Sequence, residues 1–198
     1  AEMRENNIPE WFIESCKKIS YLFPRAHAVA YVMMAFRIAW FKVYHPLAFY
    51  AAYFSIRAKA FDLRIMTGDL KTQLTEFNRI KALDRAASPK DKDLMSALEV
   101  SMEMYQRGYR FINVDIQHSE ARRFSIKEGA LLPPFLAIDA LGETVSDAIV
   151  EERNEHPFTS LKDLQRRCKV SNTIIDLMKE LKCCGELPED EQMSLFGA

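Results

Sequence analysis

Residues 135–188 decide the fold of this chain, and they read FLAIDALGETVSDAIVEERNEHPFTSLKDLQRRCKVSNTIIDLMKELKCCGELP. Turn and capping residues divide this stretch into helical segments. Gly142 precedes one predicted helix, Ser160 opens a second with capping-box spacing, and Ser171 caps a third that ends near Gly185. The stretch therefore predicts two consecutive helix-turn-helix units.

The first turn, Ile138-Asp139-Ala140-Leu141-Gly142, has the spacing of a helix-hairpin-helix turn. That motif places glycines in an apolar-Gly-apolar-Gly turn, so that backbone N–H groups approach a DNA phosphate at the start of the next helix. An alanine stands at the first glycine position, which predicts a degenerate turn or a weaker phosphate contact. A plain helical hairpin would have the same sequence. The candidate DNA-binding residues of this turn are Ala140, Leu141, Gly142, Glu143 and Thr144.

The second turn, around Cys168-Lys169-Val170-Ser171, has no glycine. A short basic cluster lies beside it, at the start of a predicted helix, where phosphate oxygens could bind. A solvated helix face would show the same charges, so both interpretations stay open. The candidate DNA-binding residues here are Lys162, Arg166, Arg167, Lys169 and Ser171.

The most apolar part of the chain is residues 26–54. A helix over 25–43 is apolar nearly all round, which predicts burial on most sides, and His45-Pro46 separates it from a second helix over 46–58. Charged residues interrupt the first of these too early for the run of about 20 apolar residues that a bilayer requires. We therefore expect two core helices rather than a membrane span.

The middle of the chain changes from helix to strand. A weaker helix is expected over 70–83, and Ser88 caps a clearer one, with apolar residues Leu94, Leu98, Met102 and Tyr105, that Gly108 ends. Residues 111–116 and 123–127 have the composition of short strands. The expected fold is mainly α with a small β element.

Composition limits the classes of function. The 198 residues hold 27 Lys and Arg against 28 Asp and Glu, for a net charge of −1, and 48% are hydrophobic. A polycationic nucleic-acid binder is excluded, so any nucleic-acid site must be a local patch. Cys16, Cys168, Cys183 and Cys184 form no C-x-x-C pair, which favours reduced thiols and no metal site. No apolar signal core opens the chain, and the missing initiator Met indicates a piece of a longer protein.

The C-terminal stretch has the composition of a peptide ligand. An acidic segment leads to an apolar pair with nothing nearby to pack against, which favours a pocket on another protein. The alternative is a tail that folds back on its own core. The candidate partner-binding residues are Gln192, Met193, Ser194, Leu195 and Phe196.

Arg25, His27 and Tyr31 form another candidate site, within the locally basic stretch 25–64. His27 and Tyr31 share a helix face, and a cation at a helix start opposes the helix dipole, so Arg25 is more easily explained as a ligand for an anion. A core helix with internally satisfied polar residues is the alternative. The D-x-D at 91–93 is explained by helix capping, and the sequence shows no catalytic constellation.

Several blocks together resemble the C-family bacterial replicative DNA polymerases, and most closely the C-terminal portion of the PolC type, the polymerase III alpha subunit. The blocks are FPRAHAVAY at 23–31, RIAWFKVYHPL at 37–47, YFSIRA at 53–58, RGYRF at 107–111, LPPF at 132–135, GE at 142–143 and PF at 157–158.

The resemblance implies a layout in four segments. Residues 1–110 would be the C-terminal part of the polymerase fingers, 111–134 a small mixed β segment, 135–187 a tandem helix-hairpin-helix duplex-binding domain, and 188–198 a clamp-binding tail. Arg25, His27 and Tyr31 would contact the incoming nucleotide. The apolar helices would pack against polymerase elements absent from this chain.

The resemblance also implies partners and absences. Primer-template DNA, the incoming dNTP, the sliding clamp (beta subunit) and other replisome proteins would be partners, in the bacterial cytoplasm at the nucleoid and without a membrane. No cofactor would bind this piece, because Mg²⁺ and the catalytic carboxylates belong to the palm. A stand-alone DNA- or clamp-binding module, and a helical scaffold that binds protein, remain alternatives.

Overall fold

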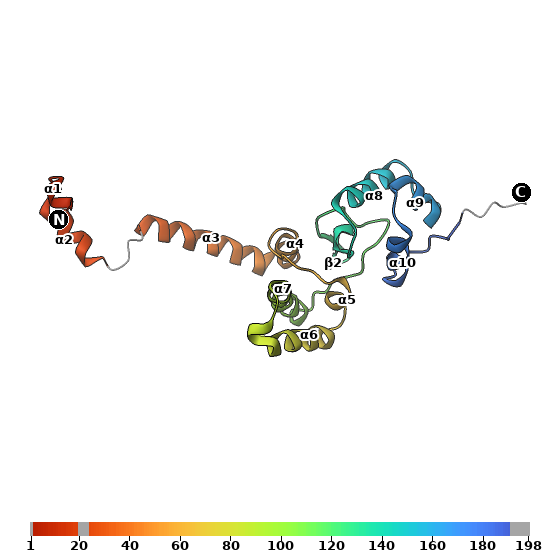
Figure 1. The fold of residues 1–198 in the computed structure, drawn as a ribbon, viewed down its shortest axis with the longest axis horizontal. Coiled ribbons are helices and arrows are strands. Elements are labelled where there is room, and N and C mark those ends of the chain that lie inside the picture. Colours follow the sequence, from red (N-terminus) through yellow and green to blue (C-terminus); the bar gives the residue numbers. More distant parts are fainter. Residues whose placement is uncertain (1, 20–23, 191–198) are drawn as a thin grey trace, which may run out of the picture. The chain divides into compact units, whose positions relative to one another are not determined.

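The computed structural model describes residues 2–19 and 24–190 (Figure 1). The chain forms two compact units, which divide between Val43 and Tyr44. In the first unit, α1 (Glu2–Glu5) and α2 (Glu10–Lys18) precede α3 (Arg25–Tyr44), whose last residue belongs to the second unit. The division in four segments expected from the sequence stays a prediction.

Helix α3 has the bounds that its sequence predicts but not the predicted burial. It begins at Arg25 and ends before His45-Pro46, and none of its residues, all of which the structure describes, is buried. Phe36 is 74% exposed and Tyr31 67%. The predicted burial is not formed within this chain, so the packing of α3 against polymerase elements outside it stays a prediction.

Helix α3 also has the length and composition of a membrane-crossing helix. The charged residues within α3 therefore do not by themselves exclude a membrane span, contrary to what the short uncharged run indicates. A core helix of a soluble protein has the same length and composition.

The second unit is mainly helical with one small sheet, as the sequence predicts. Its helices are α4 (Pro46–Ile56), α5 (Leu63–Met66), α6 (Leu70–Leu83), α7 (Pro89–Gln106), α8 (Glu143–Glu155), α9 (Leu161–Cys168) and α10 (Asn172–Glu180), with 3₁₀ turns η1 (Asp84–Ala86) and η2 (Phe135–Ala137) and strands β1 (Ser125–Lys127) and β2 (Ala130–Leu132). Helix α10 ends several residues before Gly185, because Lys182 takes the left-handed conformation (φ 56°).

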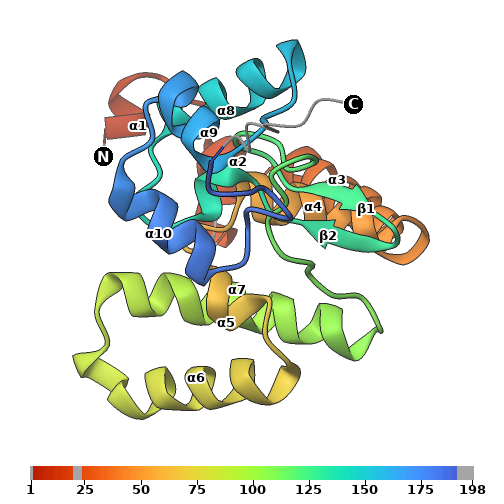
Figure 2. The ribbon, with the colours of Figure 1, turned by 90° about the vertical axis from the view of Figure 1, so that its right-hand side faces the viewer.

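Helices α6 and α7 lie side by side (Figure 2). The hydroxyl of Ser88 accepts the N–H of Asp91, and the Asp91 carboxylate accepts the N–H of Ser88, both at 3.1 Å. This capping box accounts for the first acidic residue of the D-x-D. Between the two helices, the buried Ser101 hydroxyl donates to the Gln73 side chain at 2.6 Å, so both buried polar groups are satisfied.

The sheet contains only one of the two strands that the sequence predicts, 111–116 and 123–127. Strand β1 pairs antiparallel with β2, and residues 111–116 contribute an isolated bridge from Phe111 to Leu131. The connecting residues Glu128 and Gly129 both have positive φ (52° and 75°), as a two-residue hairpin turn with matching twist requires. The predicted strand at 111–116 is wrong because a turn at Asp115 ends the extended segment.

Two apolar cores form in the second unit. The first contains Tyr50, Phe54, Met66, Ile80, Leu98, Met104, Phe111 and Leu131. Of the predicted α7 stripe, Leu94 and Leu98 are buried, whereas Met104 is buried where Met102 was expected.

The second core joins α8, α9 and α10. It contains Val114, Ile116, Phe135, Ile138, Leu141, Ile149, Leu164, Cys168, Val170, Ile175, Met178 and Cys183. Burial raises the pKa of the Cys168 thiol to about 11 and that of Cys183 to about 12, so both are protonated at neutral pH. All four cysteines are free, as the sequence predicts.

Candidate nucleic-acid interface

The two predicted hairpin turns have the same backbone geometry although their sequences differ. Ala140 and Lys169 both take the left-handed conformation, with φ of 64° and 55°. A buried apolar residue follows each, Leu141 in one turn and Val170 in the other. An N-cap then opens the next helix, at φ −76°, ψ 163° before α8 and φ −71°, ψ 155° before α10. The chain therefore repeats one turn at two places.

Ala140 occupies a backbone position that glycine would adopt more easily. A left-handed residue with a Cβ costs about 1–2 kcal/mol relative to its usual conformation. The buried Leu141 fixes the turn against the core, so the alanine keeps the expected geometry at some cost in stability. The turn is therefore degenerate in sequence, because it has alanine in place of glycine, but its backbone has the left-handed conformation of the glycine turn.

Gly142 is not required by the structure around it. Its φ is one that any residue adopts, and a Cβ added there would meet no atom within 4 Å. No side chain caps the first turn of α8 at this residue, whereas Ser171 caps α10 by accepting the N–H of Ile174. The start of α8 therefore presents uncapped N–H groups and the positive end of the helix dipole to an open surface.

Arg122 neutralises the acidic side chain beside this open turn. Glu143, the first residue of α8, pairs with the Arg122 guanidinium at 2.6 Å, and Arg122 also pairs with Asp147 one turn further on. Thr144 is exposed next to Glu143. Sequence reasoning missed Arg122, because it lies outside the two turns and no pattern links it to α8.

The basic cluster of the second turn divides into solvent-facing and inward-facing residues. Lys162 and Lys169 are exposed, and the Arg166 side chain is 75% exposed while it pairs with Asp163. The Arg167 side chain is only 17% exposed, and its guanidinium lies 4.7 Å from the ring centre of Phe158. Three of the four cations therefore face solvent.

Arg167 uses its donors within the chain. It donates to the Glu152 side chain at 3.0 Å, to the Glu152 carbonyl, to the His156 carbonyl at 3.0 Å and to Asp163 at 3.3 Å. These bonds tie α9 to the end of α8.

The remaining predicted site residues belong to the first unit and to the C-terminal stretch. Arg25 is the first residue of α3, and the rings of His27 and Tyr31 meet edge to face with centroids 4.5 Å apart, which shows that they share a helix face. Residues 192–196 lie outside the described part of the chain. Within residues 2–19 and 24–190, no group of three His, Cys, Asp or Glu side chains could hold a metal ion.

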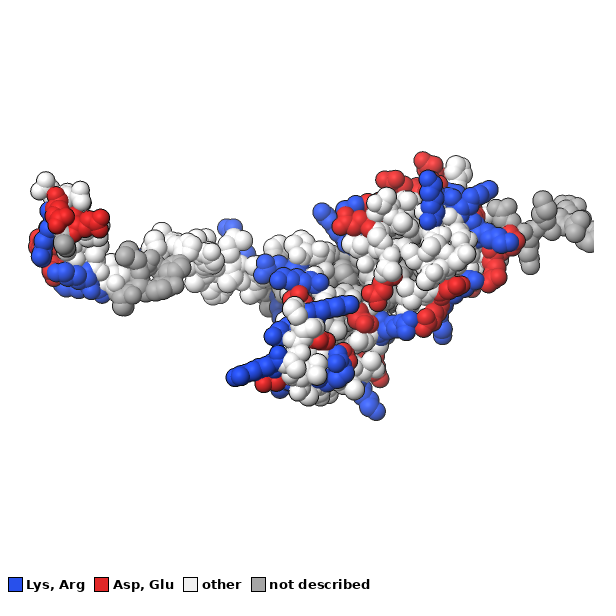
Figure 3. All heavy atoms as spheres, viewed as in Figure 1, with Lys and Arg blue, Asp and Glu red and all other residues white. Residues whose placement is uncertain are grey.

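Charges of both signs are interspersed over the visible face of the second unit (Figure 3). This mixture agrees with the near-zero net charge, and it limits phosphate binding to local features such as the two turns.

Comparison with known proteins identifies the family. A model of the helix-hairpin-helix motif matches residues 108–192, which include both turns. A PolC-type DNA polymerase III of Caldanaerobacter subterraneus subsp. tengcongensis is 48% identical over 195 residues, which are 98% of this chain. The chain is homologous to the C-terminal portion of PolC-type DNA polymerase III. A PolC-type DNA polymerase III of Streptococcus pyogenes serotype M12 is likewise 48% identical over 197 residues. The chain spans 14% and 13% of these two PolC-type polymerases, and the resemblance drawn from the sequence is confirmed.

Proposed function

We propose that this chain is the duplex-gripping, clamp-tethered C-terminal part of a replicative DNA polymerase. The observation that supports duplex binding best is the repeated turn, with an uncapped helix start at Gly142 and solvent-facing cations beside Ser171. Backbone N–H groups and cations that bind phosphate read no sequence, which suits an enzyme that must copy any template.

The two turns would bind phosphates by different means. At α8 the donors are the free N–H groups of the first turn, with Arg122 holding Glu143 aside. At α10 the Ser171 side chain already caps the helix, so Arg166 and Lys169 supply the attraction. Arg167 acts by positioning α9 and does not contact DNA.

The duplex contact is tested by the salt dependence of DNA affinity. Arg166→Ala combined with Lys169→Ala removes two exposed cations and should flatten the slope of log K against log salt by about 1–2. Fluorescence anisotropy with a 20-base-pair duplex between about 50 and 200 mM salt measures the slope. Lys90→Ala with Lys92→Ala, at the exposed start of α7, is the matched loss of charge and should leave the slope unchanged. Equal slopes for both variants would mean that Arg166 and Lys169 face solvent and do not contact DNA.

Residues 192–196 would dock the polymerase on its sliding clamp. Leu195→Ala with Phe196→Ala should weaken binding of this chain to a bacterial sliding clamp at least about 100-fold, because two apolar anchors leave the pocket. Isothermal titration with purified clamp measures this affinity. Leu74→Ala with Leu83→Ala removes two exposed apolar residues elsewhere and is the control. Unchanged affinity in the tail variant would leave the alternative of a tail that folds on its own core.

The role of α3 would be to lie over the incoming nucleotide, through Arg25, His27 and Tyr31. Its exposed apolar faces would pack against polymerase elements outside this chain, whose palm would hold the Mg²⁺ ions and catalytic carboxylates. A cytoplasmic location follows from this role. A stand-alone module remains the alternative, and the gene sequence upstream of Ala1 decides between them, since palm carboxylates there would make the protein a polymerase.

A further inference from the structure

A pocket lies at the end of α8 opposite the hairpin turn. It has a volume of about 580 Å³ and is formed by residues 116–118, the last turns of α8, residues 157–158 and Leu187. A helix rises about 1.5 Å per residue, so Arg153 lies roughly 16 Å along α8 from Gly142. The pocket is therefore separate from the proposed duplex contact.

Arg153 brings a partly desolvated cation to this pocket. Its Nη1 donates to the carbonyl of Ser119 at 2.8 Å and to that of Ile116 at 3.2 Å. The side chain is half-buried, its guanidinium lies 5.8 Å from the ring centre of Phe135, and burial lowers its pKa. Among the residues that the structure describes, Arg153 forms no ion pair, and only its Nη1 donates a hydrogen bond, while Glu120 and Asp115 attract it at longer range. The guanidinium thus keeps donors for a ligand, in contrast to Arg167.

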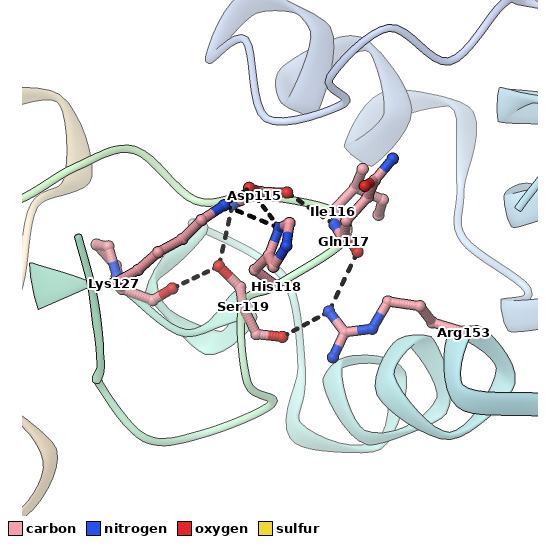
Figure 4. Close-up of polar contacts among 8 residues, drawn as sticks. Asp115, Ile116, Gln117, His118, Ser119, Lys127 and Arg153 are labelled. Atoms are coloured by element: carbon pink, nitrogen blue, oxygen red, sulfur yellow. Dashed lines mark hydrogen bonds and ion pairs between the residues drawn. The ribbon is translucent and has the colours of Figure 1, made fainter. Parts of the chain in front are cut away.

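The loop opposite Arg153 is fixed by Asp115 (Figure 4). The carboxylate accepts the Gln117 N–H at 2.8 Å and Lys127 Nζ at 2.9 Å, and it contacts His118 Nδ1 at 2.9 Å. The buried Ser119 hydroxyl accepts the Asp115 N–H and donates to the carbonyl of Pro133. Asp115 bonds Lys127 and forms no ion pair with Arg153, although it and Glu120 attract the guanidinium at longer range and act to raise its pKa. The loop presents its carbonyls to Arg153 in a preformed geometry.

The remaining lining combines apolar and hydrogen-bonding groups. Pro157 and Leu187 supply the exposed apolar surface beside the buried Ile116 and Phe158, and Gln117 and His118 are exposed at the rim. A phosphodiester would use the cation but not the apolar surface. A carboxylate next to apolar side chains uses both, because a guanidinium binds a carboxylate through two parallel hydrogen bonds while apolar neighbours leave water.

We propose that this pocket binds a peptide segment of a partner protein in which an aspartate or glutamate is flanked by apolar residues. The carboxylate pairs with the free donors of Arg153, the flanking apolar side chains pack on Pro157 and Leu187, and Gln117 and His118 hydrogen-bond the peptide backbone. The chain then has a protein-docking site at the far end of α8 from its DNA contact.

A peptide array read with the full chain tests the proposal. Hexapeptides carry Asp, Glu, Asn, Gln or phosphoserine at the centre, flanked by Leu and Phe or by Ser. Asp and Glu between apolar flanks should retain at least about tenfold more chain than Asn and Gln, since a charge-assisted hydrogen bond is lost with the amides. Arg153→Met should abolish this preference.

Arg153 also supports the loop, so its loss could unfold the pocket, and a second variant tests the site without removing Arg153. Gln117→Glu adds a negative charge at an exposed rim position and should reduce retention of the acidic peptides about tenfold. Gln106→Glu, at the exposed end of α7, makes the same change away from the pocket and should not. Circular dichroism checks that both variants are folded.

Four results would overturn the proposal. Equal retention of acid and amide peptides, or equal behaviour of the two glutamate variants, would remove the carboxylate site. Preference for phosphoserine, with displacement of the acidic peptide by a 20-base-pair duplex, would assign the pocket to nucleic-acid phosphate. Acidic-peptide binding seen only after removal of residues 191–198 would show that the chain's own tail competes for the pocket.

Discussion

Arg167→Ala is expected to lower the free energy of unfolding by about 2–4 kcal/mol, whereas Arg166→Ala should change it by less than about 0.5 kcal/mol. The two residues are neighbours in sequence and both pair with Asp163, so the comparison separates the inward contacts of Arg167 from a surface ion pair. Arg166 is 75% exposed and Arg167 17% exposed. Loss of the buried guanidinium leaves the carbonyls of Glu152 and His156 without this donor and removes the contact with Phe158.

The carboxylate of Asp163 adds a dependence on pH. Burial acts to raise the pKa of Asp163, but hydrogen bonds from Arg166, the Thr159 N–H and Arg167 outweigh it and hold the pKa below its ordinary value. The stability that this carboxylate contributes is present above its unfolded pKa of about 4 and is lost as the pH falls through its folded value. Removal of Arg167 raises the folded value, so the variant should lose stability at a higher pH than the parent.

Urea unfolding followed by far-UV circular dichroism measures both effects. Arg167→Lys should recover part of the loss at most, because a lysine cannot bond Glu152 and the two carbonyls in the same planar arrangement. Equal destabilisation by both alanine variants would contradict the positioning role of Arg167.

Local signals were predicted well because their causes lie within a few residues. Ser88, Ser160 and Ser171 each accept the N–H three residues on, as helix caps do, and these bonds fix where α7, α9 and α10 begin. The small sheet was predicted as an element, but its pairing was not, because two residues with positive φ at 128–129 make a tighter hairpin than the sequence suggested.

Properties that depend on direction or on distant partners were not predictable. The four cations of the second turn look alike in sequence, yet Arg167 points inward to a carboxylate on another helix. The two turns share one backbone conformation, although neither has glycine at its left-handed position. Gly142 marks the first turn in the sequence, but no glycine marks the second, so a glycine pattern finds only the first. Arg153 gave no signal at all, because its meaning comes from a loop more than thirty residues away in sequence.

Gly142→Asp should stabilise the fold and weaken DNA binding at the same time. An aspartate at an N-cap accepts N–H groups of the first turn and interacts favourably with the helix dipole, which adds a few tenths to about 1 kcal/mol. The added Cβ meets no atom within 4 Å, and the backbone conformation suits any residue. Duplex affinity should fall at least about tenfold, because the new carboxylate occupies the N–H groups and repels the phosphate. If Gly142 had only a structural role, the substitution would not raise stability while lowering duplex affinity.

Two matched variants separate the cap from the charge. Gly142→Ser caps α8 without a negative charge and should cost less affinity than the aspartate. Ser171→Asp makes the same change at the second turn, where a side chain already occupies the N–H of Ile174, so the loss there reports on repulsion alone and should be smaller. Anisotropy with a 20-base-pair duplex gives the affinities, and urea unfolding gives the stabilities. An aspartate at position 142 that leaves affinity unchanged would mean that no phosphate approaches the start of α8, and the duplex contact would then rest on Arg166 and Lys169.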